Sequence, residues 1–313
     1  MKKTVKILWL ALALAFTVGI VLMAAGFFAG ASLGMYVDGG GLHVSEQGGG
    51  AGKTEEADLE SFNKIKLNVD NADVKIVEAE KNGLEITYYG AKPSYSVTDG
   101  TLIIAKNEEH AFNIFDFGPI FEKGNEIVIF REAGEALDDI DLQVACGGIT
   151  GSGVRANTMR CADSMGDVRL ESVEIGKFTG KLNAGNLKIS DSIFTSIAIE
   201  NDLGDVNLRN VTASDSTISL NAGKVEAKGD FGNVRINNDL GDIVLSTVNP
   251  KGQYQYDLSV DLGGIKIDGD SFRGSVRGSS ETGALKYHDS LGGPWRLECS
   301  ANCGNIEVNF ENR

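Results

Sequence analysis

Two acidic phrases are the part of this sequence with the clearest capacity for chemistry. Asn201–Leu208 reads NDLGDVNL, and Asn238–Leu245 reads NDLGDIVL. Carboxylates beside a glycine are typical of calcium ligands, and equally typical of tight turns in which Asn and Asp side chains bond to the backbone. The two uses differ in how closely the carboxylates converge, so the elements that carry the phrases decide between them.

Both phrases belong to a repeat that is marked by glycine. The second residue after each marking glycine is apolar in nine cases of nine, and the seventh before it is apolar in eight of nine, with Ser216 as the exception. A regular period near 20 residues is typical of a solenoid, because a single coil cannot bury its apolar face alone. The marking glycines are 18 to 22 residues apart and lie at Gly147, Gly166, Gly185, Gly204, Gly223, Gly241, Gly263, Gly283 and Gly304.

The coils are predicted to be built from strands. Between the marked positions apolar and polar residues alternate, as in VNLRN and VRINN, which is the period of a half-buried strand. We therefore predict an all-β fold, a parallel β-helix or β-solenoid with coils of about 19 residues. The less regular stretch FNKIKLNVDNADVKI, from Phe62 to Ile76, has the same cadence and indicates that the strands begin there.

Residues three and one before each glycine are expected to point into the coil. Where the first of the two is polar the second is large, as in Asn201 and Leu203. Where the first is a bulky aliphatic residue the second is small, as in Leu182 and Ala184. Such alternation would let neighbouring coils interdigitate at the density of a protein interior. NDLGD is then one of two alternating coil types, and LNAG is the other.

The residue after each glycine is expected to form an outward ladder. Carboxylates fall on alternate coils, an order that avoids like charges stacked directly on one another. Carboxylates two coils apart are separated by roughly 9.6 Å, too far to converge on calcium, so a structural turn is favoured and calcium remains the alternative. The ladder consists of Asp167, Asn186, Asp205, Lys224 and Asp242.

The four cysteines fit the same register. Cys146 and Cys303 stand directly before a glycine, and Cys161 and Cys299 stand five before one. Cys299 and Cys303 would be about 13 Å apart along one strand, which is too far for a disulfide. All four are therefore predicted to be small core residues with reduced thiols, and the lack of a CxxC argues against a zinc ribbon.

The N-terminal region is predicted to anchor the chain in a membrane. Ile7 to Val37 contains no charged residue, a run of 31, whereas about 20 apolar residues span a bilayer as a helix. Ala29 to Ala31 could serve as a signal-peptidase site, but the run is longer than a signal peptide needs. Lys2, Lys3 and Lys6 precede the run, which places the N-terminus in the cytoplasm and the rest of this single-pass protein outside.

Small residues recur on one face of the predicted anchor. Such spacing permits close approach of two helices and hence a homo-oligomer, although membrane helices are in any case rich in glycine. The glycines concerned are Gly19, Gly26, Gly30 and Gly34.

The remaining organisation is predicted in three parts. Residues 1–37 hold the basic start and anchor, 38–57 a flexible Gly-rich linker, and 58–313 the solenoid, whose coils are less regular over 58–139 and regular over 140–313. Within 110–124 an aromatic loop is predicted either to cap an open end of the solenoid or to expose an apolar patch to a partner or the membrane surface. Its apolar residues are Phe112, Phe115, Phe117, Ile120 and Phe121.

Several functions are disfavoured by composition and motifs. A net charge of −15 argues against nucleic acid, whose phosphates require a basic face. The chain has three histidines in unrelated contexts and neither a GxSxG elbow nor an HExxH helix. We predict no cofactor, no metal and no catalytic residue, with a carbohydrate-active enzyme on a β-helix as the alternative.

The phrases FNKIKLNVDNADVKI, NEIVIF, DDIDLQVACGGITGSG and the repeated GDVxL, GNLKI and GDIVL resemble the bacterial "putative adhesin" β-strand-repeat family, over residues 62–310. That family has no established function and occurs in envelopes of Gram-positive bacteria, in part beside envelope-stress sensing systems. The resemblance implies a membrane-anchored binding or scaffolding protein of the envelope, linked to adhesion or stress sensing. Its expected partner is a wall polymer or envelope protein, and a purely structural surface spacer is the other alternative.

Overall fold

The computed structural model describes residues 35–38, 41–44, 52–88, 92–105, 112–115, 125–134, 136–272, 285–290 and 292–311. These residues form two compact units. In the smaller unit, β1 (Met35–Asp38) lies between β2 (Gly41–Val44) and β8 (Phe112–Phe115), and all pairing is antiparallel. None of the helices among the described residues is long and apolar enough to cross a bilayer. The predicted anchor lies outside these residues except for its last three, which belong to β1 rather than to a helix.

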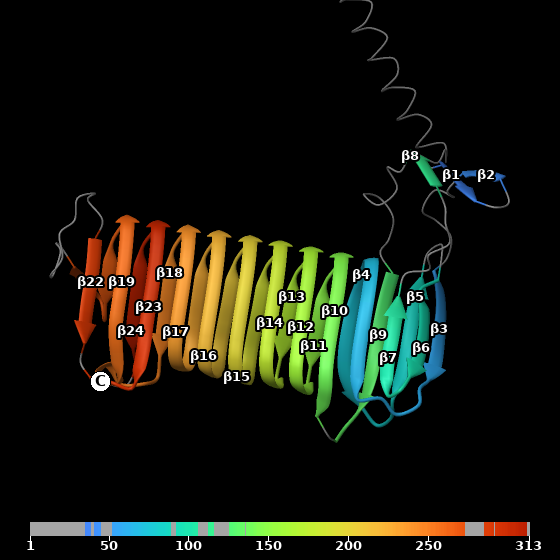
Figure 1. The fold of residues 1–313 in the computed structure, drawn as a ribbon, viewed down its shortest axis with the longest axis horizontal. Coiled ribbons are helices and arrows are strands. Elements are labelled where there is room, and N and C mark those ends of the chain that lie inside the picture. Colours follow the sequence, from blue (N-terminus) through green and yellow to red (C-terminus); the bar gives the residue numbers. More distant parts are fainter. Residues whose placement is uncertain are drawn as a thin grey trace, which may run out of the picture. The chain divides into compact units, whose positions relative to one another are not determined.

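The larger unit is a stack of β-coils (Figure 1). It also contains one short 3-10 turn, η2 (Lys251–Gln253). Its strands are β3 (Lys53–Asp58), β4 (Lys64–Ala79), β5 (Gly83–Tyr88), β6 (Ser94–Thr98), β7 (Thr101–Ala105), β9 (Asn125–Glu132), β10 (Leu137–Cys146), β11 (Ile149–Ser152), β12 (Arg155–Met165), β13 (Val168–Glu171), β14 (Glu174–Ala184), β15 (Leu187–Leu203), β16 (Val206–Ala222), β17 (Val225–Leu240), β18 (Ile243–Thr247), β19 (Tyr254–Leu262), β20 (Ile265–Ile267), β21 (Asp270–Phe272), β22 (Leu285–Ser290), β23 (Trp295–Cys303) and β24 (Ile306–Phe310).

Neighbouring coils pair in parallel with a register of one repeat. Leu187 pairs with Val206, and Val206 pairs with Val225, so residues that are equivalent in the repeat lie beside one another. The all-β solenoid predicted from the glycine period is confirmed. The reason is that each coil has the same alternation, and only this register brings every apolar side chain to the same interior.

The core is a set of apolar ladders inside the coils. In the coil that begins at Val206 the inward side chains are all less than 5% exposed, and all but one of them are apolar. The exception, Ser216, leaves a buried hydroxyl without a hydrogen-bond partner in the structure. The seven inward residues are Val206, Leu208, Val211, Ala213, Ser216, Ile218 and Leu220.

The last coil in the sequence is not the last coil in space. β23 pairs with β17 on one side and with β19 on the other, and β24 lies in the same way between β18 and β20 (Figure 1). At the corner, Gly241 N donates to Cys303 O at 2.8 Å, and Gly304 N donates to Leu262 O at 2.9 Å. The glycine series therefore passes from Gly241 to Gly304 and then to Gly263, and Gly283 lies outside the described residues.

The N-terminal end is built in the same way. β4 pairs with β10 and β11 on one side and with β7 and β9 on the other, although β7 and β9 follow it in the chain. Beyond these coils, antiparallel strands cover the stack: β5 and β6 at one end, β21 and β22 at the other. Covered ends are expected in a soluble solenoid, because an open parallel edge invites pairing with another chain.

The predicted linker, residues 38–57, is wrong in part. Gly41–Val44 forms β2, and Lys53–Asp58 forms β3, which pairs with β5. Alternation in KTEEAD is masked by its polarity: the burial pattern of β3 has only half-buried residues on its inner face. Because the segment is almost entirely polar, its composition predicts a solvated linker and gives no sign of a strand.

Candidate functional site

The repeated acidic phrases form one bend of every coil, which we call the glycine corner, from three residues before the coil glycine to one after it. Coils approach so closely here that a side chain on the glycine has no room. At Gly204, whose φ is +131°, an added Cβ would lie 2.0 Å from the carbonyl oxygen of Gly185. The sequence places glycine at this bend because the backbone conformation and the close contact both require it.

The residues after the glycines form a hydrogen-bonded ladder on the outside of the corner. Asn186 N donates to Asp167 Oδ1 at 2.8 Å, Asp205 N to Asn186 Oδ1 at 3.0 Å, and Lys224 N to Asp205 Oδ1 at 2.8 Å. At the inserted coil, Asn305 N donates to Asp242 Oδ1 at 2.8 Å, and at the other end of the stack Gly148 N donates to Asp73 Oδ1 at 2.7 Å. Each Asx oxygen therefore satisfies a backbone donor of the next coil, which an ordinary strand ladder leaves unpaired at a bend.

The structure thus brings the five predicted ladder residues into one row and gives the side-chain oxygens of its four Asn and Asp members a structural use. The pKa of the Asp167 carboxyl is lowered, first by the hydrogen bond from Asn186 N, with further contributions from the Asn186 side chain and from Arg169. No group of three or more metal-ligating side chains occurs among the described residues. A turn built from Asn and Asp side chains accounts for the repeated phrases.

A second polar row lies inside the corner, three residues before the glycine on alternate coils. Asn201 Nδ2 donates to Gly185 O at 3.1 Å, and Asn238 Nδ2 donates to Gly223 O at 2.9 Å. These side chains are at most 3% exposed, and each reaches back to the glycine carbonyl of the preceding coil. The buried amides therefore clamp pairs of coils together.

Asp163 occupies the equivalent place in an earlier coil but is an acid. Its Oδ1 accepts a hydrogen bond from Met165 N at 3.1 Å, whereas its buried Oδ2 has no hydrogen-bond partner in the structure. Burial raises the pKa of the Asp163 carboxyl to about 6. An added Cβ on Gly166 would meet both Asp163 Oδ2 and Gly147 O within 2.7 Å, so the carboxyl lies beside the carbonyl that an amide would bond.

The residue directly before the glycine points outward, and the prediction that it packs in the core is wrong. Met165 is 60% exposed, Leu203 57%, Leu240 56% and Leu262 69%. From Asn201 to Val206 two exposed residues stand in succession, so the alternation of a straight strand breaks at the bend. Positions three and one before the glycine share a face only if the strand continues, and here the chain turns between them.

We call this outward set the apolar row. Large and small residues alternate along it without exception once the coils are taken in their spatial order. The small members are half-buried and the large members are exposed. In that order the row is Cys146, Met165, Ala184, Leu203, Ala222, Leu240, Cys303 and Leu262.

The cysteines divide between the two sides of the coil. Cys161 and Cys299 are buried, as predicted, and burial raises the pKa of both thiols, that of Cys299 to about 12. Cys146 and Cys303 are not core residues: they are half-buried members of the apolar row. All four cysteines are free.

Two residues of the predicted aromatic loop fall within the described part of the chain. Phe112 pairs with Val37 and Phe115 pairs with Met35, so both belong to β8 of the smaller unit. The other residues predicted as sites, Phe117, Ile120, Phe121 and the four anchor glycines, lie outside the described residues. Antiparallel strands of the larger unit cover the ends of the solenoid, and the capping or binding role of residues 110–124 stays a prediction.

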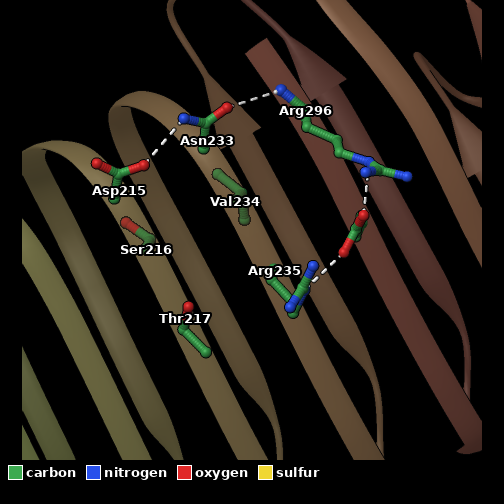
Figure 2. A pocket seen from close by; sticks show the side chains of 8 residues that line it. Asp215, Ser216, Thr217, Asn233, Val234, Arg235 and Arg296 are labelled. Carbon is green, nitrogen blue, oxygen red and sulfur yellow. Dashed lines mark hydrogen bonds and ion pairs between the residues drawn. The ribbon is translucent and has the colours of Figure 1, made fainter.

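A hollow of about 260 Å³ lies across β16, β17 and β23 (Figure 2). Arg235 Nε and Arg296 Nε each lie 2.5 Å from an oxygen of Glu298, and Asn233 joins Asp215 to the backbone of Arg296. Its charged groups are thus paired with one another, as in a surface ladder. Sequence reasoning missed this group because Arg235 and Glu298 are 63 residues apart and meet only through the inserted coil.

Together, the stacked parallel coils and the hydrogen-bonded corner define an all-β solenoid protein. The chain belongs to the family described as Toastrack DUF4097, which it matches over residues 62–288. This match confirms the resemblance inferred from the repeated phrases. No curated protein matches the chain.

Solved structures resemble the chain over most of its length. A putative adhesin from Bacteroides fragilis NCTC 9343 is 13% identical, over 83% of this chain and 98% of its own, with a TM-score of 0.50. A putative cell adhesion protein from Clostridium sporogenes ATCC 15579 is 16% identical, over 83% and 100%, with a TM-score of 0.26. A putative adhesin from Parabacteroides distasonis ATCC 8503 is 11% identical, over 83% and 98%, with a TM-score of 0.39. The likeness to the Bacteroides protein concerns the fold alone.

Proposed function

We propose that this protein is a non-catalytic binding or scaffolding module of the cell envelope, held at the membrane by its N-terminal apolar run and facing outward. One observation carries the proposal. The side chains with the best capacity for chemistry, those of the glycine corner, are bonded to the backbone of the next coil and hold the stack together. The fold then offers other molecules a rigid surface on which equivalent positions of successive coils lie side by side.

The family and the charge support the same class of function. A solved structure with a similar fold, from Bacteroides fragilis, is named a putative adhesin. The net charge of −15 disfavours nucleic acid as the partner, since its phosphates require a basic face. A role in adhesion or in sensing envelope stress fits an outward-facing solenoid with a membrane anchor.

The proposed topology is testable with the native cysteines. In intact cells a membrane-impermeant maleimide is expected to label the full chain at Cys146 and Cys303, which are partly exposed, and to leave buried Cys161 and Cys299 unlabelled. Labelling only after lysis would overturn the outward placement. Mass spectrometry of the labelled peptides distinguishes the sites, and the chain with Cys146 and Cys303 changed to Ser is the control.

Binding is tested by purifying the tagged full chain after cross-linking in intact cells. Co-purification of a wall polymer or an envelope protein supports the binding module. A parallel chain with residues 112–121 replaced by Gly and Ser assigns the contact: loss of the partner places it on the aromatic segment, and retention places it on the solenoid. A chain that brings down nothing beyond itself supports the structural spacer instead.

Variants of the ladder carboxylates test the alternative that the protein is an enzyme. Asp205→Asn and Asp242→Asn keep an oxygen that can accept the backbone hydrogen bonds now made to Asp205 and Asp242. A non-catalytic module should show no carbohydrate-cleaving activity in the native chain or in either variant. Disappearance of a carbohydrate-cleaving activity in either variant, with an unchanged fold, would overturn the proposal.

A further inference from the structure

The apolar row is a feature that the packing of the coil does not require. Its four large side chains are 56% to 69% exposed, and the cores beneath them are filled by other residues. Every second coil carries a large member, so these side chains repeat at about 9.6 Å along the stack, with small residues between them. Exposed apolar groups in a continuous line are typical of an interaction surface.

Carboxylates flank the row on both sides. Leu203 lies between Asp202 and Asp205, and Leu240 lies between Asp239 and Asp242. Asp202 accepts a hydrogen bond from Asn221 Nδ2 at 2.7 Å, and Asp239 accepts one from Asn302 Nδ2 at 2.9 Å. The acids are thus held in place beside the row rather than free to swing away.

The one lysine of the outer ladder is paired with an acid of its own coil. Lys224 stands in the outer ladder between Asp205 and Asp242, and its Nζ lies 2.8 Å from Glu226. Hydrogen bonding to Glu226 is the largest cause of the raised pKa of Lys224, so its charge faces Glu226 at neutral pH. The corner therefore presents an apolar line bordered by negative charge.

We propose that the apolar row and its flanking carboxylates dock a cationic amphipathic α-helix of a partner protein. Residues seven apart on a helix are about 10.5 Å apart, close to the spacing of the large members of the row. One apolar stripe on the helix would cover Met165, Leu203, Leu240 and Leu262, and the small residues between them would receive its side chains, as holes receive knobs. Lysine or arginine on either side of that stripe would face the carboxylates.

Charge decides between this occupant and others. A second copy of the chain would match large against small residues, but it would also bring two sets of carboxylates together. An anionic lipid surface would meet the same repulsion. The proposal rests on the proposed function, because it names the partner class of that same binding module.

The direct test uses the full chain and a labelled synthetic 21-residue helix with leucine at heptad positions and lysine on both flanks. Fluorescence anisotropy measures binding at low and moderate salt. The double variant Leu203→Asn, Leu240→Asn is expected to weaken binding by about tenfold or more, since it removes two central anchors. Ile193→Asn is the matched control, because Ile193 is 56% exposed but lies outside the row, and it should change binding by less than about twofold.

A charge variant tests the flanks. Asp202→Asn with Asp239→Asn should weaken binding several-fold at low salt and reduce its salt dependence, as expected when steering charges are removed. Glu171→Gln with Glu174→Gln removes the same charge elsewhere on the coil, and its effect should be smaller. Equal losses in the two charge variants would show attraction to the overall charge, and equal losses in Ile193→Asn and the leucine variant would show non-specific apolar contact. Either result would overturn the docking site.

Three further outcomes separate this inference from self-association and from the proposed function. If the leucine variant abolishes self-association in sedimentation and leaves peptide binding unchanged, the row is an interface between copies and the helix proposal is wrong. If the leucine variant still captures its envelope partner in cells, the binding module is supported and the proposed docking surface is wrong. If the peptide binds as expected but no envelope partner is captured, the docking surface is supported and the proposed envelope function is wrong.

Discussion

At the scale of the residue, the inner polar row shows how one side chain sets a pH dependence. Asn201 and Asn238 donate to glycine carbonyls, whereas Asp163 must hold a proton to make the same contact. Burial raises its pKa to about 6, against an ordinary value of about 3.9 in the unfolded chain. Between these values the folded chain keeps a proton that the unfolded chain has lost, so the free energy of unfolding falls as pH rises through this window.

Asp163→Asn is expected to remove that dependence. An amide stays neutral and can donate toward Gly147 O, so the variant should be more stable than the native chain at pH 7.5, by up to about 3 kcal/mol. At pH 4 the two should differ by less than about 1 kcal/mol, because the acid is then protonated in the folded state. Urea denaturation at several pH values checks this, and a constant difference between the two chains would contradict it.

The thiols give a second prediction at this scale. Burial raises the pKa of Cys161 and Cys299, so neither forms thiolate near neutral pH, and both should resist thiol reagents in the native purified chain. Cys146 and Cys303 are partly exposed and should react. Quantitative labelling is expected to modify two thiols of four in buffer and all four in urea, and rapid loss of the buried pair in buffer would contradict the structure.

At the scale of the element, the glycine corner limits how closely coils can stack. Gly204→Ala would place a Cβ 2.0 Å from Gly185 O and also strain the backbone. We expect a loss of about 3 to 5 kcal/mol in the free energy of unfolding, since the coils must separate or the corner must rearrange. Gly269→Ala is the control: its φ is +83° but nothing lies within 4 Å of the added Cβ, so the loss should be about 1 kcal/mol. Equal losses would show that strain alone, rather than close contact, selects glycine.

At the scale of the whole larger unit, one coil near each end is inserted out of chain order. β23 and β24 are bonded on both sides, so the C-terminal coil joins β17 and β18 to β19 and β20. In a solenoid stacked in chain order, removal of the last coil would leave the remaining coils paired. Here the removal of β23 and β24 takes away a neighbour both of β17 and β18 and of β19 and β20.

A chain that ends at Gly293 is therefore expected to lose more than its missing residues. Residues 254–267 should become accessible to protease together with the exposed edge of β17 and β18. A chain that ends at Glu311 keeps every described strand and serves as the control. Limited proteolysis with mass spectrometry checks this, and a protected fragment that retains β19 and β20 would contradict it.

The repeat alone determined a large part of this protein. Alternation within a strand and the period of the glycines are local properties, and they are sufficient to predict β-coils, a solenoid, the inward residues such as Val206 and Ile218, and the row formed by Asp167, Asn186 and Asp205. They are sufficient because one register of the coils buries every apolar face at once. The family resemblance follows from the same repeated phrases.

Tertiary structure decided the rest, for reasons that no local pattern contains. Leu203 faces outward because the chain bends before Gly204, where Gly185 of the preceding coil approaches closely. Glu298 meets Arg235 because β23 enters between β17 and β19, and coils with equivalent edges and equal periods do not reveal which neighbour each will choose. Side-chain direction at a bend and the order of coils both depend on long-range backbone pairing.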